Sequence, residues 1–279
     1  ISYQNKECLV EIYGGFGNQL FQLAFCMDLN EKGLKVLVNT RDFRRVEKEN
    51  SDHLTARKLV LPTDYFGFNE IDSLHYLNYK IRRVLRKSIT IGKFISNDKI
   101  FQLFNDKNFN INNLKKKNYF IGHWQNLEII KNNKKKIEES ISNNTLLKKA
   151  LNNENYKDTT LIHVRRGDYL KFNEELPISY YEKSIELIKH KSKNTKFMVY
   201  TDDIAWCKKQ NIFKIVADFF TSTDSPQDTV QTFSSMLQNK NFIIANSTFS
   251  LLAATLGKKK NSIITYPDPW FKFRNYNKN

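Results

Sequence analysis

The sequence predicts an α/β protein with parallel, doubly wound sheets, and three observations support this fold class. Residues 8–38 read as strand, glycine turn, helix and strand, which is how a βαβ unit begins. Apolar strands alternate regularly with helical segments from residue 160 to residue 266. Between these regions, residues 142–158 are rich in Asn and Lys, as a domain boundary often is. We therefore expect two domains, residues 1–150 and residues 151–279.

The first domain starts clearly and then becomes irregular. In its first helix, Phe21, Phe25 and Leu29 are spaced four apart, and Gly33 suits the helix end. The expected elements, in chain order, are a strand over 8–13, a glycine turn, a helix over 18–32, a strand over 35–38, an amphipathic segment over 74–87, a strand over 118–122 and a helix through 127–142.

The second domain repeats one alternation throughout. Its expected elements are strand 160–164, helix 179–191, strand 196–200, helix 204–209, strand 212–216, helix 228–238, strand 242–245, helix 250–256 and strand 262–266. Five strands joined by helical segments imply a parallel sheet, because parallel neighbours need crossover connections.

The composition is that of a globular protein. Hydrophobic residues make up 40% of the 279, and no apolar run approaches the ~18 residues that span a bilayer. The three cysteines form no Cys-x-x-Cys pattern, so we expect no disulfide framework or zinc site, and a reducing cytoplasm fits. The histidines lack metal-ligand spacing, and residues 202–203 are not the Asp-x-Asp of metal-dependent sugar transferases, so no metal is expected.

The charge suggests an anionic partner. Lys and Arg number 45 against 29 Asp and Glu, which gives a formal net charge of +16. The lysine runs at 115–117, 134–136 and 258–260 are explained most simply as solvated faces. Attraction to an anionic membrane surface or a lipid-linked phosphate is the main alternative. Nucleic acid is not expected, because the runs lack interleaved aromatic residues.

The segment around residue 165 has the residues of a phosphate-binding turn. Residues 161–164 predict a buried strand that ends at Arg165 and Arg166, whose paired guanidinium donors match phosphate oxygens. Gly167 permits a tight turn, and Asp168 can brace an arginine or accept a proton.

Neighbouring residues leave alternatives open. His163 alternates with Val164 and is a core or cleft histidine. Asp202 follows the strand 196–200, where an acidic side chain could bind a base, a sugar hydroxyl or an arginine, or cap the next helix. Either arginine alone could therefore pair with an aspartate and only brace the domain.

Two helix starts offer backbone N–H groups to an anion. Gly15, Gly17 and Asn18 lie between a strand and a helix, although Leu20 replaces the third glycine of the dinucleotide fingerprint and the Walker lysine is absent. A tight turn is the alternative. Near residue 250, Ser247 or Thr248 is expected to cap a helix, and with Ser250 this start would form a second phosphate cradle.

Five motifs in chain order, and a sixth at the end, resemble glycosyltransferase family 11, the α-1,2-fucosyltransferases. They are Gly-Gly-Phe-Gly-Asn-Gln-Leu-Phe-Gln-Leu-Ala (14–24), Gly-His-Trp-Gln (122–125), His-Val-Arg-Arg-Gly-Asp-Tyr (163–169), Tyr-Thr-Asp-Asp (200–203), Phe-Ile-Ile-Ala-Asn-Ser-Thr-Phe-Ser (242–250) and Tyr-Pro-Asp-Pro-Trp-Phe (266–271). The resemblance covers nearly the whole chain.

The resemblance implies a type B glycosyltransferase fold, with two Rossmann-like domains facing across a cleft. It also implies metal-free transfer of L-fucose from GDP-β-L-fucose to O2 of a terminal galactose, with inversion. The first domain would bind the acceptor, a galactose-terminated oligosaccharide or lipid-linked glycan of surface polysaccharide assembly. The second would bind the donor. The protein would then be cytoplasmic or peripheral on the inner face of the membrane.

The resemblance also assigns roles to residues. Arg165 would bind the β-phosphate and stabilise the leaving GDP as charge develops. The other donor-binding residues it implies are Gly15, Gly17, Asn18, His163, Arg166, Asp202, Ser247, Thr248 and Ser250, with Asp168 completing the arginine motif. Asp168 is also the first candidate for the catalytic base, with bracing of an arginine as its alternative. The other candidate bases are Glu11, Asp28 and Glu128.

One segment departs from the family. Residues 251–255 read Leu-Leu-Ala-Ala-Thr where the family usually has tryptophans, so acceptor preference or cleft packing is in doubt. Transfer of another nucleotide-linked sugar is a second hypothesis. A non-catalytic, basic polyanion-binding module is a third.

Overall fold

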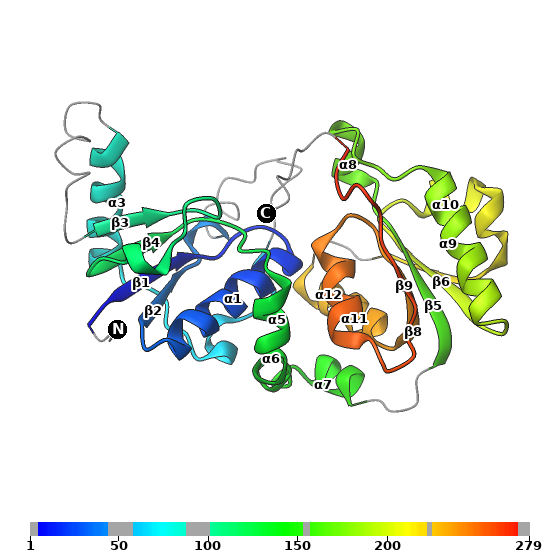
Figure 1. Cartoon of the computed structure of the whole chain (residues 1–279), viewed down its shortest axis with the longest axis horizontal. Coiled ribbons are helices and arrows are strands. Elements are labelled where there is room, and N and C mark those ends of the chain that lie inside the picture. The colour runs from blue at the N-terminus through cyan, green and yellow to red at the C-terminus, as the bar shows by residue number, and fades with distance from the viewer. Residues whose placement is uncertain (1–4, 44–57, 88–100, 153–156, 222–224, 273–279) are drawn as a thin grey trace. The chain divides into compact units, whose positions relative to one another are not determined.

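The computed structural model divides into two compact units, Ile1–Ile141 and Ser142–Asn279 (Figure 1). The structure describes residues 5–43, 58–87, 101–152, 157–221 and 225–272. Each unit contains a parallel sheet between helices, as the α/β fold class predicts. Within the described residues, no helix is long and apolar enough to cross a membrane.

The first unit contains a four-stranded parallel sheet. Its strands, in spatial order, are β2 (Lys35–Asn39), β1 (Glu7–Glu11), β4 (Lys117–Phe120) and β3 (Phe101–Phe104). Its helical segments are α1 (Phe16–Glu31), η1 (Thr63–Phe66), α3 (Ser73–Lys87), η2 (Ile111–Asn113), α5 (Leu127–Asn132) and α6 (Lys134–Ile141).

The alternation along β1 separates two layers of core. Leu9 belongs to a cluster with Tyr79 of α3 and Tyr119 of β4, whereas Cys8 and Val10 point to the opposite face. Helix α1 is buried along most of its length, because its sequence is apolar nearly all round. The two faces of the sheet are therefore covered by α1 and α3 (Figure 1).

The second unit contains a five-stranded parallel sheet. Its strands, in spatial order, are β7 (Val216–Phe220), β6 (Lys196–Thr201), β5 (Lys157–Val164), β8 (Asn239–Ile243) and β9 (Ile264–Thr265). Its helical segments are α7 (Thr145–Leu151), α8 (Gly167–Lys171), α9 (Ile178–Lys191), α10 (Ile204–Lys209), η3 (Asn211–Ile215), α11 (Pro226–Leu237) and α12 (Thr248–Gly257).

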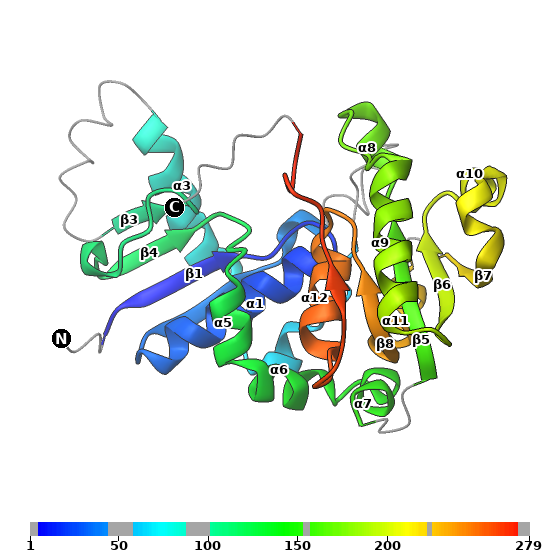
Figure 2. The ribbon, with the colours of Figure 1, turned by 45° about the vertical axis from the view of Figure 1, so that its right-hand side comes forward.

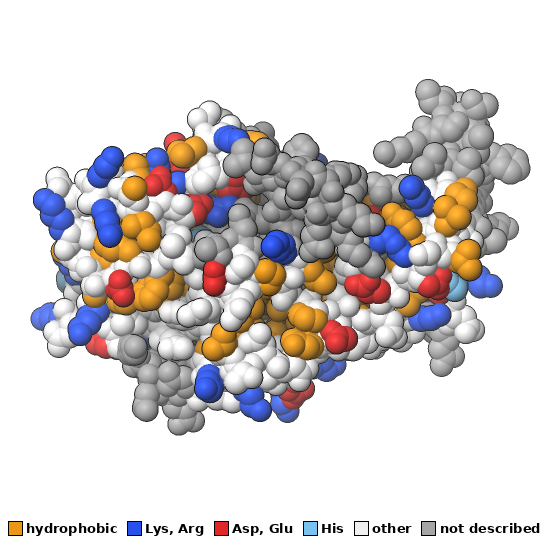
Figure 3. Space-filling model, turned by 180° about the vertical axis from the view of Figure 1, so that it is seen from behind, with side chains coloured by type: hydrophobic (Ala, Val, Ile, Leu, Met, Phe, Trp, Pro, Cys, Tyr) orange, Lys and Arg blue, Asp and Glu red, His pale blue; other side chains and the backbone are white. Residues whose placement is uncertain are grey.

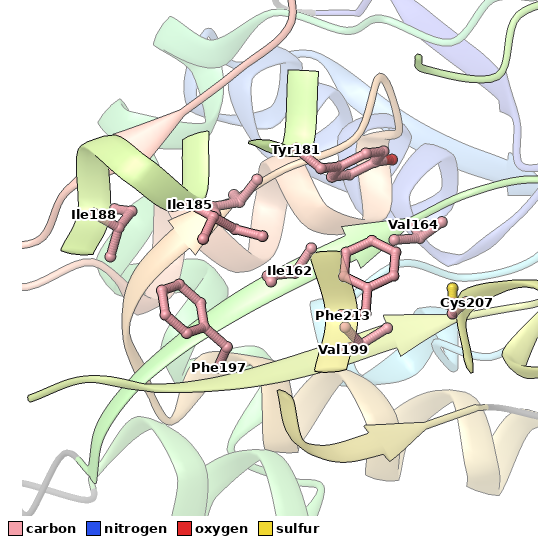
Figure 4. Packing of buried hydrophobic residues seen from close by; sticks show 10 residues of the cluster. Ile162, Val164, Tyr181, Ile185, Ile188, Phe197, Val199, Cys207 and Phe213 are labelled. Carbon is pink, nitrogen blue, oxygen red and sulfur yellow. The ribbon is translucent and has the colours of Figure 1, made fainter. Parts of the chain in front are cut away.

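The second sheet carries α9 and α10 on one face and α11 and α12 on the other (Figure 2). Under α9, Ile162 and Val164 of β5 pack against Tyr181 and Ile185 of the helix and Phe197 of β6 (Figure 4). All five side chains are at most 5% exposed, so β5 is fixed firmly at the centre of the sheet.

Two predictions of secondary structure were wrong. The predicted strand 212–216 is the 3₁₀ helix η3, and the edge strand β7 follows it. Strand β7 reads Val-Ala-Asp-Phe-Phe and is mostly exposed or half-buried, so its apolar signal is weaker than that of the turn before it. The predicted helix 127–142 is two helices, because the chain bends at the buried Asn133 between α5 and α6.

One strand and two α-helices of the described residues were not predicted, and neither were the short 3₁₀ helices η1 and η2. Strand β3 lies in the region whose pattern is irregular. Helix α7 lies in the Asn- and Lys-rich stretch, where Asn144 caps it by accepting hydrogen bonds from the N–H groups of Leu146 and Leu147. Helix α8 is only five residues long, too short for a periodic pattern to indicate it.

Each sheet has a switch point, where successive connections leave a central strand in opposite directions. In the first sheet β1 lies between β2 and β4, and in the second β5 lies between β6 and β8. Open α/β sheets bind ligands beyond the carboxyl ends of the strands at this point. The segments that follow β1, β4, β5 and β8 are therefore where a site is expected. The motifs at 14–24, 122–125, 163–169 and 242–250 include or adjoin these segments, and the motif at 200–203 ends the neighbouring strand β6.

Candidate functional site

Arg165 follows β5 at the switch point of the second sheet and is held by two carboxylates. Its Nη2 donates to Oδ1 of Asp168 at 2.5 Å, and its Nη1 lies 2.8 Å from Oδ2 of Asp202. The strand register explains the second contact. Val164 is paired with Thr201 of β6, so the residues that follow them, Arg165 and Asp202, leave the sheet side by side. The Arg165 side chain is 22% exposed, so it remains accessible to a ligand.

Arg166 is fixed on the other side of the same turn. Its Nε donates to Oδ2 of Asp203 at 3.1 Å, its guanidinium lies 3.8 Å from the centre of the Trp206 ring, and its backbone N–H donates to Oδ1 of Asp202. Asp203 also caps α10 by accepting the N–H of Trp206. Two arginines therefore meet three aspartates, and both members of the acidic pair contact arginine.

Gly167 begins α8 directly against Asp202. A Cβ atom at this position would lie 2.7 Å from Oδ2 of Asp202, closer than real Cβ contacts. The glycine therefore allows the close approach of the carboxylate that holds Arg165, and any larger residue would displace that carboxylate.

His163 connects β5 to the start of α12. It is 6% exposed, and its Nδ1 is hydrogen-bonded to Oγ of Ser250 at 2.8 Å. Burial, with a smaller contribution from the charge of Arg165, lowers the pKa of His163 from 6.5 to about 3. The imidazole is consequently neutral near pH 7 and adds no positive charge to the site.

The start of α12 follows β8 and combines hydroxyl groups with the backbone N–H groups of a helix start. Ser247 caps the helix, its Oγ accepting the N–H of Phe249 at 3.4 Å, as predicted for one of two residues. Thr248 is the first helical residue, and Ser250 is fully buried. Tyr169 of α8 donates to the carbonyl of Asn246 at 2.8 Å, which ties the arginine turn to this helix start.

The glycine loop of the first unit lies at the switch point of its own sheet. Gly14 adopts a left-handed φ of 80°, and Gly15 caps α1 through backbone geometry alone. A Cβ atom on Gly15 would meet nothing within 4 Å, so this position faces open space. Gly17 is buried in the first turn of α1, and Asn18 accepts a hydrogen bond from Nε2 of Gln125 at 3.0 Å.

We call the loops around the start of α1, at residues 13–15, 58–61 and 122–125, the rim of the first unit. Two buried glutamines of α1 hold these loops in place. Gln19 donates to the carbonyls of Gly14 and Lys58 and accepts the N–H groups of Val60 and Leu61. Gln22 accepts the N–H of Tyr13 and donates to the carbonyl of Gly122. Gln19 thus has a structural role that accounts for one polar side chain of the motif.

The segment after β4 completes the rim. Asp106 accepts the N–H groups of His123 and Trp124 at 2.9 and 2.7 Å, and the His123 ring lies 5.0 Å from that of Tyr13. Burial, followed by the charges of Asp106 and other nearby acids, raises the pKa of Tyr13 to about 12. The Tyr13 phenol therefore stays protonated at neutral pH.

The other candidate bases occupy different places in the first unit. Glu11 ends β1 and accepts a hydrogen bond from Tyr119. Asp28 is ion-paired with Lys32 near the far end of α1, about 18 Å along the helix from its start, so the structure does not bring it to the rim. Glu128 is paired with Lys131 in the exposed first turn of α5.

Sequence reasoning missed Asp106, Gln22 and Tyr169. Asp106 lies in a region without a periodic pattern, so nothing in the sequence indicated it. Gln22 and Tyr169 lie inside recognised motifs, and a polar residue on an otherwise apolar helix face was a usable signal for Gln22. Within the described ranges, no group of three or more His, Cys, Asp or Glu side chains could hold a metal ion.

A family model and two relatives each match nearly the whole chain. A model of glycosyl transferase family 11 matches residues 8–276. The chain is 30% identical over 284 residues to an α-1,2-colitosyltransferase of Escherichia coli, covering 95% of this chain and 92% of that protein. It is 27% identical over 297 residues to the O-antigen biosynthesis glycosyltransferase WbnK of Escherichia coli, covering 95% of each.

A solved structure is also similar. The NodZ α-1,6-fucosyltransferase of Bradyrhizobium, in a crystal soaked with GDP-fucose, gives a TM-score of 0.48 at 10% identity, covering 90% of this chain and 92% of that one.

Proposed function

Because this chain belongs to glycosyl transferase family 11, we propose that it transfers L-fucose from GDP-β-L-fucose to O2 of a terminal galactose. The product is an α-1,2-linked fucoside formed with inversion. Family membership makes the chain a glycosyltransferase and sets aside the non-catalytic polyanion-binding module. The α-1,2 linkage in the name of the colitosyltransferase relative supports the proposed linkage.

The observation that carries the proposal is the position of Arg165. It extends from the switch point of the second sheet, beside the hydroxyl-rich start of α12. Breaking the bond between the sugar and the diphosphate leaves negative charge on the β-phosphate. A fixed guanidinium and the N–H groups of a helix start stabilise such charge without reorganising during the reaction. Arg165 supplies the stabilisation that a metal gives in other transferases, so we propose no metal requirement.

The remaining residues support this binding of the diphosphate in different ways. Ser247, Thr248 and Ser250 line the helix start that receives the diphosphate. His163 positions that helix through Ser250, and Arg166 braces the turn through Asp203. In this proposal the second domain binds the donor. The first domain binds the acceptor, and its Gly15, Gly17 and Asn18 remain proposed donor-binding residues.

We assign Asp168 to bracing Arg165 rather than to proton transfer, because its carboxylate already accepts from the guanidinium at 2.5 Å. The two roles are separable. For a brace, Asp168→Asn retains more activity than Asp168→Ala, and the pH dependence of kcat is unchanged. If Asp168 is the base, both variants lose activity equally, and the acidic limb of the pH profile, where activity rises as the base loses its proton, disappears.

The acceptor is a galactose-terminated glycan. One relative is named for O-antigen biosynthesis, which supports a lipid-linked surface-polysaccharide precursor as the acceptor. We propose that the protein acts at the cytoplasmic side of the membrane.

The colitosyltransferase relative gives a second candidate donor. Colitose lacks the 3-hydroxyl group of fucose. A site that hydrogen-bonds this hydroxyl discriminates strongly against the sugar that lacks it, whereas a site that leaves it unbound does not. Turnover of GDP-fucose and GDP-colitose by the same preparation therefore decides between the donors.

The decisive experiment measures GDP release from GDP-fucose with and without lactose or N-acetyllactosamine, followed by NMR assignment of the product linkage. Arg165→Ala should lower kcat about 100- to 1000-fold. Lys240→Ala is the matched control, because it removes a basic residue of the same unit that only pairs with Asp158 at the surface. Near-normal turnover by Arg165→Ala would refute the role of Arg165, and acceptor-dependent release only from another nucleotide sugar would refute the donor.

A further inference from the structure

Helix α3 uses tyrosines to attach to the first unit. Tyr79 is 1% exposed, belongs to the cluster with Leu9 and Tyr119, and donates a hydrogen bond from its hydroxyl to Glu7 at 2.9 Å. Tyr76 packs against the same cluster, with the Arg41 guanidinium 4.4 Å from its ring centre. These contacts account for one side of the helix.

The opposite side of α3 exposes an apolar stripe to solvent. Leu74 is 83% exposed, and Leu77 and Ile81 are each 50% exposed. Their spacing of three and four residues places them in one row along the helix, roughly opposite Tyr76 and Tyr79. Elsewhere in the described chain, no helix of comparable length exposes more than one large hydrophobic side chain. The stripe plays no part in the core.

The charge of α3 indicates what this stripe contacts. The helix sequence Ser-Leu-His-Tyr-Leu-Asn-Tyr-Lys-Ile-Arg-Arg-Val-Leu-Arg-Lys contains five Lys or Arg and no Asp or Glu. Its described lysine, Lys80, is exposed. In Figure 3, hydrophobic side chains lie next to Lys and Arg side chains on the part of the first unit where α3 lies. The whole chain carries a formal net charge of +16.

We propose that α3 lies on an anionic phospholipid surface, with Leu74, Leu77 and Ile81 entering the boundary between headgroups and acyl chains. An apolar stripe on a strongly basic helix is the pattern of helices that lie in the plane of a membrane. Nucleic acid would attract the charge but would not require the stripe. A second copy of this chain would bring two basic helices together, and their like charges would oppose the contact.

This surface gives the protein a means of concentrating near membrane-bound acceptors, yet it does not depend on the transferase assignment. Each basic residue close to an anionic surface strengthens binding about fivefold, and three apolar side chains add a contribution that salt does not screen. Binding should therefore need anionic lipid and weaken with salt without vanishing.

The test is co-sedimentation of the full chain with vesicles of phosphatidylcholine alone, or containing about 30% phosphatidylglycerol. We expect binding only with phosphatidylglycerol, and weaker binding at about 1 M than at about 0.15 M salt. Leu74→Ser/Leu77→Ser/Ile81→Ser should weaken binding at least about tenfold. Lys80→Glu should weaken vesicle binding more than the removal of one basic residue would, because the substitution reverses the charge. Leu187→Ser is the control, because that side chain is 42% exposed on α9.

Three results would overturn the proposal. One is absence of binding to anionic vesicles, and another is an equal loss of binding in the control variant. The third is self-association that the triple variant abolishes, because the stripe would then cover a second copy. GDP release with free lactose should be the same for the wild type and the triple variant. Loss of that activity in both proteins would instead count against the proposed function, whatever the vesicles show.

Discussion

The carboxylate of Asp202 joins two consecutive residues of the neighbouring strand end: Oδ2 lies 2.8 Å from Nη1 of Arg165, and Oδ1 accepts the backbone N–H of Arg166. Asp202 is thus a positioning residue for Arg165. Asp202→Ala should lower kcat about 10- to 100-fold with a smaller effect on KM, because a displaced catalytic group costs rate more than ground-state binding. Asp158→Ala, a surface carboxylate of the same unit, is the steady-state kinetic control. A rise in KM alone would indicate direct donor contact instead.

A methyl group at residue 167 should disturb Arg165 indirectly. Gly167→Ala places a Cβ atom 2.7 Å from Oδ2 of Asp202, so the carboxylate must move away from the guanidinium. We expect reduced kcat with little change in the free energy of unfolding. A double-mutant cycle with Asp202→Ala checks the mechanism. If Gly167→Ala lowers kcat further when Asp202 is already absent, the clash is not the cause.

Gly15 separates a binding role of the glycine loop from a folding role. Gly15→Ala meets nothing within 4 Å and has a φ of −72°, so it should leave stability unchanged or raise it by about 0.4–1 kcal/mol. If the diphosphate approaches this loop, kcat/KM for GDP-fucose should nevertheless fall about tenfold. Gly14→Ala is the contrasting variant and should destabilise by about 1–2 kcal/mol, because its φ is 80°. If the folded Gly15→Ala variant has unchanged kinetics, the loop is a structural turn and does not bind the donor.

His163 should make stability depend on pH below neutrality. The unfolded chain protonates this group below its ordinary pKa of 6.5, whereas the folded protein does so only near 3. Stability is therefore complete above about pH 6.5 and falls as the pH decreases toward 3, by at most about 1.4 kcal/mol per unit. Between about pH 6.5 and about pH 5, wild type should lose up to about 2 kcal/mol more than His163→Asn in urea denaturation. Parallel losses in the two proteins would contradict this coupling.

The sequence was most informative where one periodicity dominated. The carboxyl-terminal part of strand β5 and the whole of helix α10 were predicted closely, because Leu161, Ile162 and Val164 are apolar and Asp203 caps the helix. The strand predicted over 212–216 was wrong because Ile212 and Phe213 are apolar side chains of a turn that packs against the core. The true strand, β7, is an edge strand with Asp218 in its middle. Local pattern could not distinguish these two uses of apolar residues.

The candidate site was predictable in its composition and less so in its pairings. Parallel strands bring their carboxyl ends to one edge, so Arg165 and the residues after 245 were expected to converge. That Asp202 and Asp203 both contact arginine depends on the register of β5 against β6, which the sequence does not state. Asp106 accepts hydrogen bonds from the N–H groups of His123 and Trp124, which lie 17 and 18 positions further along the chain. No motif spans such a separation.

The buried glutamines of α1 have a consequence for how sequences of this kind can diverge. Gln19 and Gln22 bind the neighbouring loops only through peptide groups, at Tyr13, Gly14, Lys58, Val60, Leu61 and Gly122. Peptide groups are the same whatever side chain a residue carries. The loops can therefore exchange nearly every exposed side chain while keeping their path, and new acceptor preferences can arise on an unchanged frame.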